Sequence, residues 1–172
     1  MPEFNPVLTR EEVEKSVVEI ARRISMDYQN QDLVLVGVLK GAFIFLSDLC
    51  RNLTVPVQVD FVQASSYGAG TSSSGNIELN LDIHLDIREK NVLIVEDIVD
   101  TGLTLSYLVE HVKGLGAKTV KICTLIDKRE RREIDIDVDY ACHVVDAGFL
   151  VGYGLDYAEN YRELPGVYHL KL

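Results

Sequence analysis

The sequence predicts an α/β fold in which helices cover both faces of a mostly parallel sheet. Three short, largely apolar runs, at residues 33–38, 92–95 and 119–126, are typical of strands buried on both faces. Segments with helical spacing alternate with these runs, and strands that alternate with helices form parallel sheets. The 172 residues, 47% of them hydrophobic, suffice for one core but are too few for two ordinary domains. We therefore expect one domain over residues 1–172.

The N-terminal part is predicted to contain two helices on either side of one strand. Thr9 and Glu12 form a capping-box pattern, and the helix that follows should run to about Ser25. The apolar run at 33–38 predicts a strand that leads into Leu39-Lys40-Gly41, after which a second helix should cover the sheet. The apolar residues at helical spacing are Val13, Val17, Ile20 and Ile24 in the first helix, and Phe43, Phe45, Leu46 and Leu49 in the second.

The middle of the chain shows two alternating segments, at residues 55–61 and 77–83, which predict two strands. The residues between them, 65–76, are rich in glycine and serine and should form a flexible loop. A buried strand at 92–95 should lead into a helix after Gly102, with apolar residues at Leu105, Leu108, Val109 and Val112. Further strands are expected at 119–126 and 140–145, and a short edge strand from Val167.

An acidic, hydroxyl-rich turn joins the strand at 92–95 to the following helix, with the sequence Glu96-Asp97-Ile98-Val99-Asp100-Thr101-Gly102-Leu103-Thr104. Backbone amides and threonine hydroxyls converge at such a helix N-terminus and favour an anion. The three carboxylates are suited to sugar hydroxyls or a metal ion. Lys40, Asp100 and Lys128 all follow predicted strands, and ligands of parallel sheets gather at the carboxyl ends of strands. One phosphate- and sugar-binding site is therefore expected there.

This turn resembles the phosphoribosyl pyrophosphate (PRPP) signature of type I phosphoribosyltransferases. Four further segments narrow the resemblance to the hypoxanthine-guanine branch and extend it over nearly the whole chain: Leu39-Lys40-Gly41, Ser66-Tyr67, Asp127-Lys128-Arg129, and Phe149 to Tyr157 followed by Arg162. The resemblance implies the type I phosphoribosyltransferase fold, with a small hood and a flexible lid loop that starts at Ser66-Tyr67. It also implies a homodimer or homotetramer.

The resemblance assigns the PRPP side of the site. Glu96 and Asp97 would hold the ribose hydroxyls, while Asp100, Thr101, Gly102, Leu103 and Thr104 would bind the 5′-phosphate. Asp100 would also be the general base for the purine nitrogen, since a carboxylate within hydrogen-bond reach can accept the proton lost in the reaction. Leu39, Lys40, Gly41 and Arg162 would bind pyrophosphate, with an unusual cis peptide at the first of these segments. Mg²⁺ is implied as cofactor, near Glu96, Asp97 and Asp156.

The purine side is assigned in the same way. Lys128 would donate to the 6-oxo group and so select hypoxanthine and guanine over adenine, whose amino group would leave the lysine unpaired. Phe149 would stack on the purine, the Leu150 backbone would address its edge, and Asp156 would lie nearby. The family commonly has valine where Leu150 stands. The implied reaction is a purine salvage transfer that converts hypoxanthine or guanine and PRPP to IMP or GMP and pyrophosphate, the work of a pentosyltransferase.

Several of these residues also have purely structural interpretations. Asp100 could act as a helix N-cap, Lys40 could be a solvated turn residue, and Phe149 could be a core aromatic. The Gly152-Tyr153-Gly154 segment superficially suggests a dinucleotide-binding motif, but the third glycine is replaced by Tyr157. Arg129, Arg131 and Arg132 form a basic cluster that is expected at the surface, with Arg132 aligned to a structural or loop-contacting arginine of the family.

Charge and composition exclude several other functions. The formal net charge of −10 opposes binding to nucleic acid or an anionic membrane. No apolar stretch approaches the ~20 residues of a membrane span, and no signal-peptide pattern opens the chain, so a cytoplasmic location is expected. Cys50, Cys123 and Cys142 have apolar surroundings and no metal-binding spacing. Two alternatives to hypoxanthine-guanine transfer are open: a xanthine-preferring phosphoribosyltransferase and a non-catalytic PRPP-binding regulator.

Overall fold

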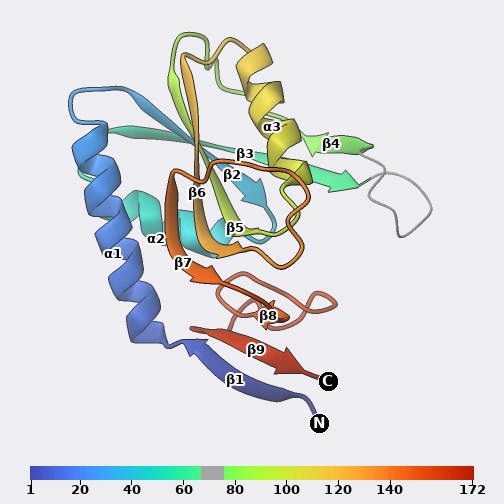
Figure 1. Ribbon diagram of the computed structural model, residues 1–172. Coiled ribbons are helices and arrows are strands. Elements are labelled where there is room, and N and C mark those ends of the chain that lie inside the picture. Colours follow the sequence, from blue (N-terminus) through green and yellow to red (C-terminus); the bar gives the residue numbers. More distant parts are fainter. Residues whose placement is uncertain (67–75) are drawn as a thin grey trace.

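The computed structural model describes residues 1–66 and 76–172 and confirms the predicted fold class (Figure 1). In the described part, six strands form one sheet in the order β4-β3-β2-β5-β6-β7, and three form a second sheet in the order β1-β9-β8. The elements are β1 (Glu3–Leu8), α1 (Arg10–Asp27), β2 (Leu33–Leu39), α2 (Phe43–Asn52), β3 (Val57–Ser66), β4 (Ile77–Leu81), β5 (Asn91–Val99), α3 (Leu103–Gly114), β6 (Thr119–Lys128), β7 (Tyr140–Val145), β8 (Leu150–Val151) and β9 (Val167–Lys171).

The larger sheet is parallel except for β4, which pairs antiparallel with β3. β2 lies between β3 and β5, and Leu35 faces Val59 on one side and Leu93 on the other. The strand ends that precede Lys40 and Asp100 therefore lie next to each other in the sheet. The carboxyl end of β6, where Lys128 is located, lies beside the end of β5. The strand order therefore brings these predicted site residues together at the carboxyl ends of β2, β5 and β6.

Successive residues of the central strands face two separate cores, which explains their continuous apolar runs. Leu33 and Leu35 pack with the apolar residues of α1 and α2 on one face. Val34 and Val36 pack on the other face with Leu105, Leu108 and Val112 of α3. Figure 1 shows α1 and α2 on one side of the sheet and α3 on the other. Helices thus cover both faces, as the alternation of strands and helices predicts.

The smaller sheet differs from the sequence-based expectation. The strand from Val167 was expected at an edge, but β9 is the central strand, between β1 and β8. β1 was not predicted, because its residues are mostly exposed and lack apolar alternation, and its pairing with β9 shifts register between Pro6 and Leu8. Proline removes a strand hydrogen bond and is tolerated at edges and bulges. We call this sheet, together with residues 152–166, the hood.

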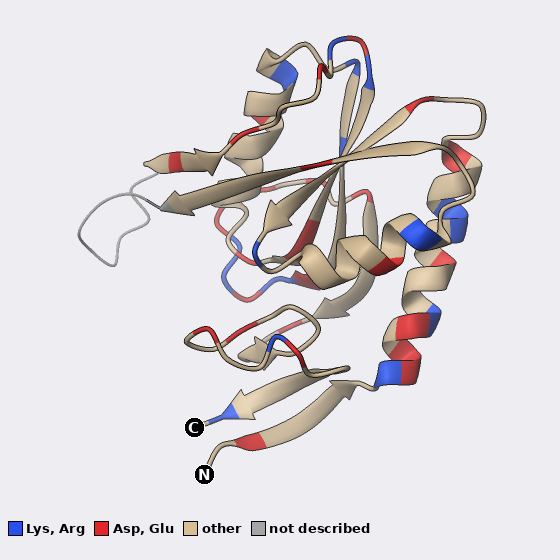
Figure 2. Cartoon of the chain, turned by 180° about the vertical axis from the view of Figure 1, so that it is seen from behind, with Lys and Arg blue, Asp and Glu red and all other residues tan. Residues whose placement is uncertain are grey.

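The first helix begins with the predicted capping box. The Glu12 amide donates to Thr9 Oγ1 at 3.2 Å, and the Thr9 amide donates to Glu12 Oε2 at 2.7 Å. The helix continues to Asp27, slightly beyond the expected end at Ser25. Charged residues follow the exposed side of α1 (Figure 2). Among the described residues, no helix is long and apolar enough to cross a membrane.

Candidate active site

The predicted site residues of β2 and β5 line a cavity of about 320 Å³ at the carboxyl ends of these strands. Residues of the hood contribute to its wall. The cavity is lined by Val38, Leu39, Gly41, Ala64, Glu96, Asp97, Ile98, Val99, Asp100, Thr101, Gly102, Thr104, Leu105, Asp156 and Arg162. Ten of these fifteen are residues that the sequence analysis assigned to substrate or metal. The fold therefore brings together positions that lie as far apart in the sequence as Leu39 and Arg162.

Two acids at the end of β5 form a tight pair. Glu96 is buried, the Asp97 amide donates to Glu96 Oε1 at 2.9 Å, and Asp97 Oδ1 accepts from the Ile98 amide at 2.7 Å. Burial raises the pKa of Glu96 well above its usual range, and the charge of Asp97 raises it further. Burial also raises the pKa of Asp97, although the hydrogen bond from Glu96 opposes this effect. Sugar hydroxyls or a cation would relieve this repulsion.

The raised pKa of Glu96 predicts a pH-dependent cost in stability. At a pH above 4.5, the ordinary glutamate pKa, Glu96 is protonated more often in the folded protein than in the unfolded chain. The free energy of unfolding therefore falls as the pH rises from 4.5 to the raised pKa of Glu96. Glu96→Gln removes this loss of stability, which is about 1.4 kcal/mol for each unit by which the pKa of Glu96 is higher in the folded protein than in the unfolded chain. We expect the variant to melt above the wild type at pH 8, by roughly 2–4 °C per kcal/mol, and close to it at pH 4.5.

Thermal melting in the absence of ligands across this pH range checks the prediction. Glu163→Gln, which alters an exposed acid of the hood, is the matched control. Its melting temperature should follow that of the wild type at every pH. If Glu96→Gln raised the melting temperature equally at pH 4.5 and pH 8, the raised pKa of Glu96 would not be the cause of the gain.

The turn after β5 has the features of an anion site. Gly102, with φ of 86°, is the N-cap of α3, and the Leu103 amide donates to Thr101 Oγ1 at 3.3 Å. The Thr101 carbonyl accepts from the amides of residues 133 and 134, at 2.9 and 3.2 Å, which anchors the turn. The amides of Thr101, Gly102 and Thr104 donate to no residue in the described part of the chain. They remain available to a phosphate at the helix N-terminus.

Asp100 is held between two cations. Its Oδ2 accepts from Arg131 Nη1 at 3.2 Å, and its Oδ1 lies 4.0 Å from Lys128 Nζ. Oδ1 is buried and has no hydrogen-bond partner among the described residues. Arg132 fixes the surrounding backbone, because it donates to the carbonyls of Asp100 and Lys128 at 2.9 and 3.1 Å. The Asp100 carboxylate is thus fixed in place while one of its oxygens is left without a donor.

Lys128 is the last residue of β6 and is buried at 7% exposure. Its Nζ lies 4.0 Å from Asp100 Oδ1 and 3.9 Å from Glu130 Oε2, beyond the 2.7–3.2 Å typical of a hydrogen bond. Glu130 Oε2 also accepts from the Gly148 amide at 3.2 Å, which brings the segment before Phe149 close to the lysine. The ammonium is therefore charge-balanced and can still donate to a ligand.

Two further purine-side residues, Phe149 and Leu150, lie outside the cavity lining. Phe149 is 51% exposed, and its ring and the Tyr157 ring pack at right angles with a centroid distance of 5.6 Å. Leu150 begins β8 and is buried, so that only its backbone is placed to meet a ligand. An exposed aromatic face beside a buried lysine is suited to a flat heterocycle. The interpretation of Phe149 as a core aromatic is wrong.

The turn at Leu39-Lys40-Gly41 packs against both β5 and the hood. The Leu39-Lys40 peptide bond is cis, as the resemblance implied. A Cβ atom on Gly41 would lie 1.8 Å from Asp97 Oδ2, and one on Gly154 would lie 2.1 Å from the Gly41 carbonyl oxygen. Arg162 closes this arrangement, since its Nη1 donates to the Gly154 carbonyl at 2.6 Å. Only glycine fits at positions 41 and 154.

Lys40 is not among the residues that line the cavity, and its Nζ lies 2.7 Å from Glu159 Oε2. Glu159 was not among the predicted site residues, and Arg131 was predicted only as part of a basic surface cluster. The contacts of Glu159 with Lys40 and of Arg131 with Asp100 cannot be inferred from spacing along the chain. Ser66, the first residue of the predicted lid, is the last residue of β3, whereas Tyr67 and the lid residues up to 75 lie outside the described part of the chain.

The predicted metal ligands do not form a complete cage. Within residues 1–66 and 76–172, no group of three Asp, Glu, His or Cys side chains could hold a metal ion unaided. Asp156 Oδ2 accepts from the Glu159 amide at 2.8 Å, and its Oδ1 lies 3.4 Å from Arg162 Nη2. Acids and cations thus alternate at the carboxyl ends of the strands and on the hood (Figure 2).

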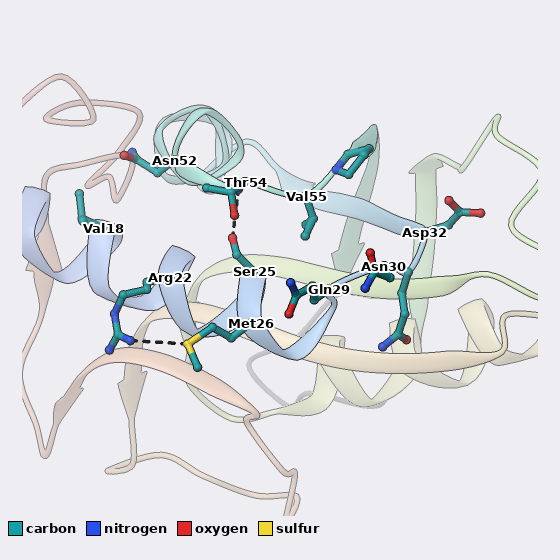
Figure 3. A pocket seen from close by; sticks show the side chains of 12 residues that line it. Val18, Arg22, Ser25, Met26, Gln29, Asn30, Asp32, Asn52, Thr54 and Val55 are labelled. Carbon is teal, nitrogen blue, oxygen red and sulfur yellow. Dashed lines mark hydrogen bonds between the residues drawn. The ribbon is translucent and has the colours of Figure 1, made fainter.

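A larger cavity, of about 740 Å³, lies between the C-terminal half of α1 and the segments that precede β2 and β3 (Figure 3). Arg22 and Met26 point toward each other at 3.6 Å on one wall, and the Thr54 amide donates to Ser25 Oγ at 3.0 Å on the other. Arg22 also pairs with Glu19 at 2.6 Å. This cavity has the size for a ligand but lacks the convergent charged groups of the smaller one.

Comparisons with known proteins agree with the geometry. The family model described as phosphoribosyl transferase domain matches residues 6–158. A hypoxanthine phosphoribosyltransferase of Salmonella typhimurium is 46% identical over 158 residues, 91% of this chain and 89% of that protein. A crystal structure of a hypoxanthine phosphoribosyltransferase from Staphylococcus aureus has a TM-score of 0.94 and 40% identity, covering 97% of this chain and 91% of that one.

Some relatives are longer than this chain. A bifunctional TilS/HprT protein of Listeria monocytogenes is 42% identical over 165 residues. That match covers 96% of this chain but only 26% of the longer protein. The chain thus spans about a quarter of the length of such relatives.

Proposed function

This chain belongs to the hypoxanthine-guanine branch of the phosphoribosyltransferase family, and we propose that it transfers phosphoribosyl from PRPP to hypoxanthine or guanine. The products would be IMP or GMP and pyrophosphate, as in purine salvage. One observation carries the proposal: a single cavity joins the acidic pair of β5, the amides at the N-terminus of α3 and the Arg162 guanidinium. These three groups match the ribose, the 5′-phosphate and the pyrophosphate of one substrate.

The roles of the residues follow from these positions. Glu96 and Asp97 would accept hydrogen bonds from the ribose hydroxyls, which their mutual repulsion favours. The amides of residues 101–104 would donate to the 5′-phosphate. Lys40, Arg162 and the turn at Leu39-Lys40-Gly41 would bind the departing pyrophosphate and stabilise its charge. The site would therefore act mainly by positioning and by electrostatics.

The purine would lie between Lys128 and the anomeric carbon of the ribose. Lys128 would donate to the 6-oxo oxygen, and the exposed Phe149 ring would stack on the purine face. Asp100 would accept the proton that the attacking ring nitrogen loses, at the oxygen that has no donor in the free protein. Since Arg131 and Lys128 flank this carboxylate, it is fixed in orientation before the purine binds.

The acids also fit the implied Mg²⁺. Mg²⁺ commonly binds one or two carboxylates together with substrate phosphates and water, and it neutralises pyrophosphate charge. In the described part of the chain, Glu96 and Asp97 form no ion pair, although the charge of Arg162 lowers the pKa of Asp97, and Asp156 lines the same cavity. We therefore propose that these three residues hold Mg²⁺ together with PRPP, which agrees with the lack of a complete protein cage.

We further propose that residues 1–172 form one domain and act in the cytoplasm as a homodimer or homotetramer. The pairing of β1 with β9 joins the two ends of the described chain, which supports one folded unit (Figure 1). The net charge of −10 supports small-molecule partners over nucleic acid or membrane. Light scattering of the purified protein measures the assembly.

A turnover assay with four purines tests the proposed function. Hypoxanthine and guanine should be converted with PRPP and Mg²⁺, whereas adenine should not react, because Lys128 has no acceptor at its 6-position. Fastest turnover of xanthine would favour the xanthine-preferring alternative. PRPP binding without turnover of any purine would favour the regulator.

A further inference from the structure

Glu159 joins the two cations assigned to pyrophosphate. Its Oε2 lies 2.7 Å from Lys40 Nζ, and its Oε1 lies 3.0 Å from Arg162 Nη2. Each carboxylate oxygen therefore takes one cation, in the way that two oxygens of a bound phosphate group would. Lys40 follows β2, while Arg162 lies on the hood, so this contact spans two parts of the site that are far apart in the sequence.

The backbone around Glu159 holds its carboxylate in this position. Glu159 has φ of 65°, its amide donates to Asp156 Oδ2 at 2.8 Å, and Tyr157 and Asn160 exchange two backbone hydrogen bonds of 3.0 Å. The Glu159 carboxylate accepts hydrogen bonds from Lys40 Nζ at 2.7 Å and from Arg162 Nη2 at 3.0 Å. The Glu159 carboxylate is thus held between the Lys40 ammonium and the Arg162 guanidinium.

The contact is also exposed enough to be exchanged. The side chains of Lys40 and Glu159 are 57% and 61% exposed, and ion pairs of this kind contribute little to stability. A pyrophosphate group carries more negative charge than one carboxylate and can outcompete it for both cations. Once it does so, the negative charge of Glu159 lies close to the bound anion and opposes it.

We propose that Glu159 competes internally for the pyrophosphate subsite: its carboxylate holds Lys40 and Arg162 in the free protein and is displaced when pyrophosphate binds. The inference rests on the proposed function, since it takes these cations as the pyrophosphate ligands. Such a competitor weakens binding of the pyrophosphate group in both substrate and product. It therefore favours release of pyrophosphate after the transfer.

Calorimetric titration of the whole protein with Mg²⁺ and pyrophosphate tests this competition. Glu159→Gln keeps the size of the side chain and removes its charge, so pyrophosphate should bind about three- to tenfold more tightly. The KM for PRPP should fall by a similar factor, while the KM for hypoxanthine stays the same. Glu163→Gln removes a nearby acid that pairs with neither cation among the described residues, and it should stay within about twofold of the wild type.

Glu159→Asp tests whether the effect of Glu159→Gln comes from the loss of the negative charge or from a change in the structure of the turn. It keeps the negative charge on the same turn and should return the affinity toward the wild-type value. Equal or weaker pyrophosphate binding by Glu159→Gln would overturn the proposal, as would an Asp variant that binds as tightly as the Gln variant. Wild-type protein that binds pyrophosphate but turns over no purine would contradict the proposed function alone, because the titration does not depend on turnover.

Discussion

Replacing Asp100 with asparagine is expected to lower turnover by about 10²–10⁴-fold, the usual contribution of a general base. The amide keeps the size of the side chain but cannot accept the purine proton. The backbone of residue 100 is held by Arg132 at 2.9 Å, so the turn should keep its shape. PRPP affinity should therefore change far less than turnover. Steady-state kinetics with hypoxanthine, together with a PRPP binding titration, measures both quantities.

The same substitution at Asp146 provides the matched control. Asp146 directly follows β7, is exposed and does not line the cavity, so Asp146→Asn should retain wild-type turnover. Turnover of Asp100→Asn near the wild-type value would remove Asp100 from the mechanism. An equal loss of PRPP binding and turnover would instead make Asp100 a binding residue.

Lys128→Ala is expected to lower kcat/KM for hypoxanthine and guanine together by about one to two decades. A charge-assisted hydrogen bond to a buried partner contributes roughly 1.5–3 kcal/mol, and the lysine is 7% exposed. PRPP affinity should be nearly unchanged, since Lys128 does not line the cavity of the phosphate-binding turn. Lys128→Gln keeps an N–H donor without the charge and should recover part of the loss.

Arg129→Ala is the matched control for the lysine, because Arg129 is adjacent and its side chain is 63% exposed and paired with Asp127. It should leave the purine profile unchanged. A Lys128→Ala variant with the wild-type profile for all four purines would refute the role of this lysine in selecting 6-oxopurines.

The central strands of the larger sheet, β2, β5 and β6, could be predicted from the sequence because they are largely buried on both faces. The run at 33–38 is apolar apart from Gly37, and five of the eight residues at 119–126 are apolar; each run starts at the first residue of β2 or β6 and makes up most of that strand. The strand from Val167 in the smaller sheet was predicted, but its partners β1 and β8 were not. β1 is mostly exposed, and the central place of β9 depends on a pairing between the two ends of the chain. Local patterning carries no information about such a pairing.

The candidate active site also has a part that could be predicted from the sequence and a part that could not. The turn from Glu96 to Thr104 could be predicted, because its residue types and spacing lie in one continuous segment. The contacts of Glu159 with Lys40 and of Arg131 with Asp100 could not, since each joins residues from separate loops. A charged residue on an exposed loop usually has no such partner, and only the fold shows which ones do.

The most direct measurement of the central claim is ³¹P NMR of a mixture of the protein, Mg²⁺, PRPP and hypoxanthine. The account predicts that the PRPP signals are replaced by those of pyrophosphate and a nucleoside 5′-monophosphate in equal amounts, and that Asp100→Asn slows this change. Unchanged PRPP, or pyrophosphate released together with ribose 5-phosphate while hypoxanthine is not consumed, would contradict the proposed transfer to the purine.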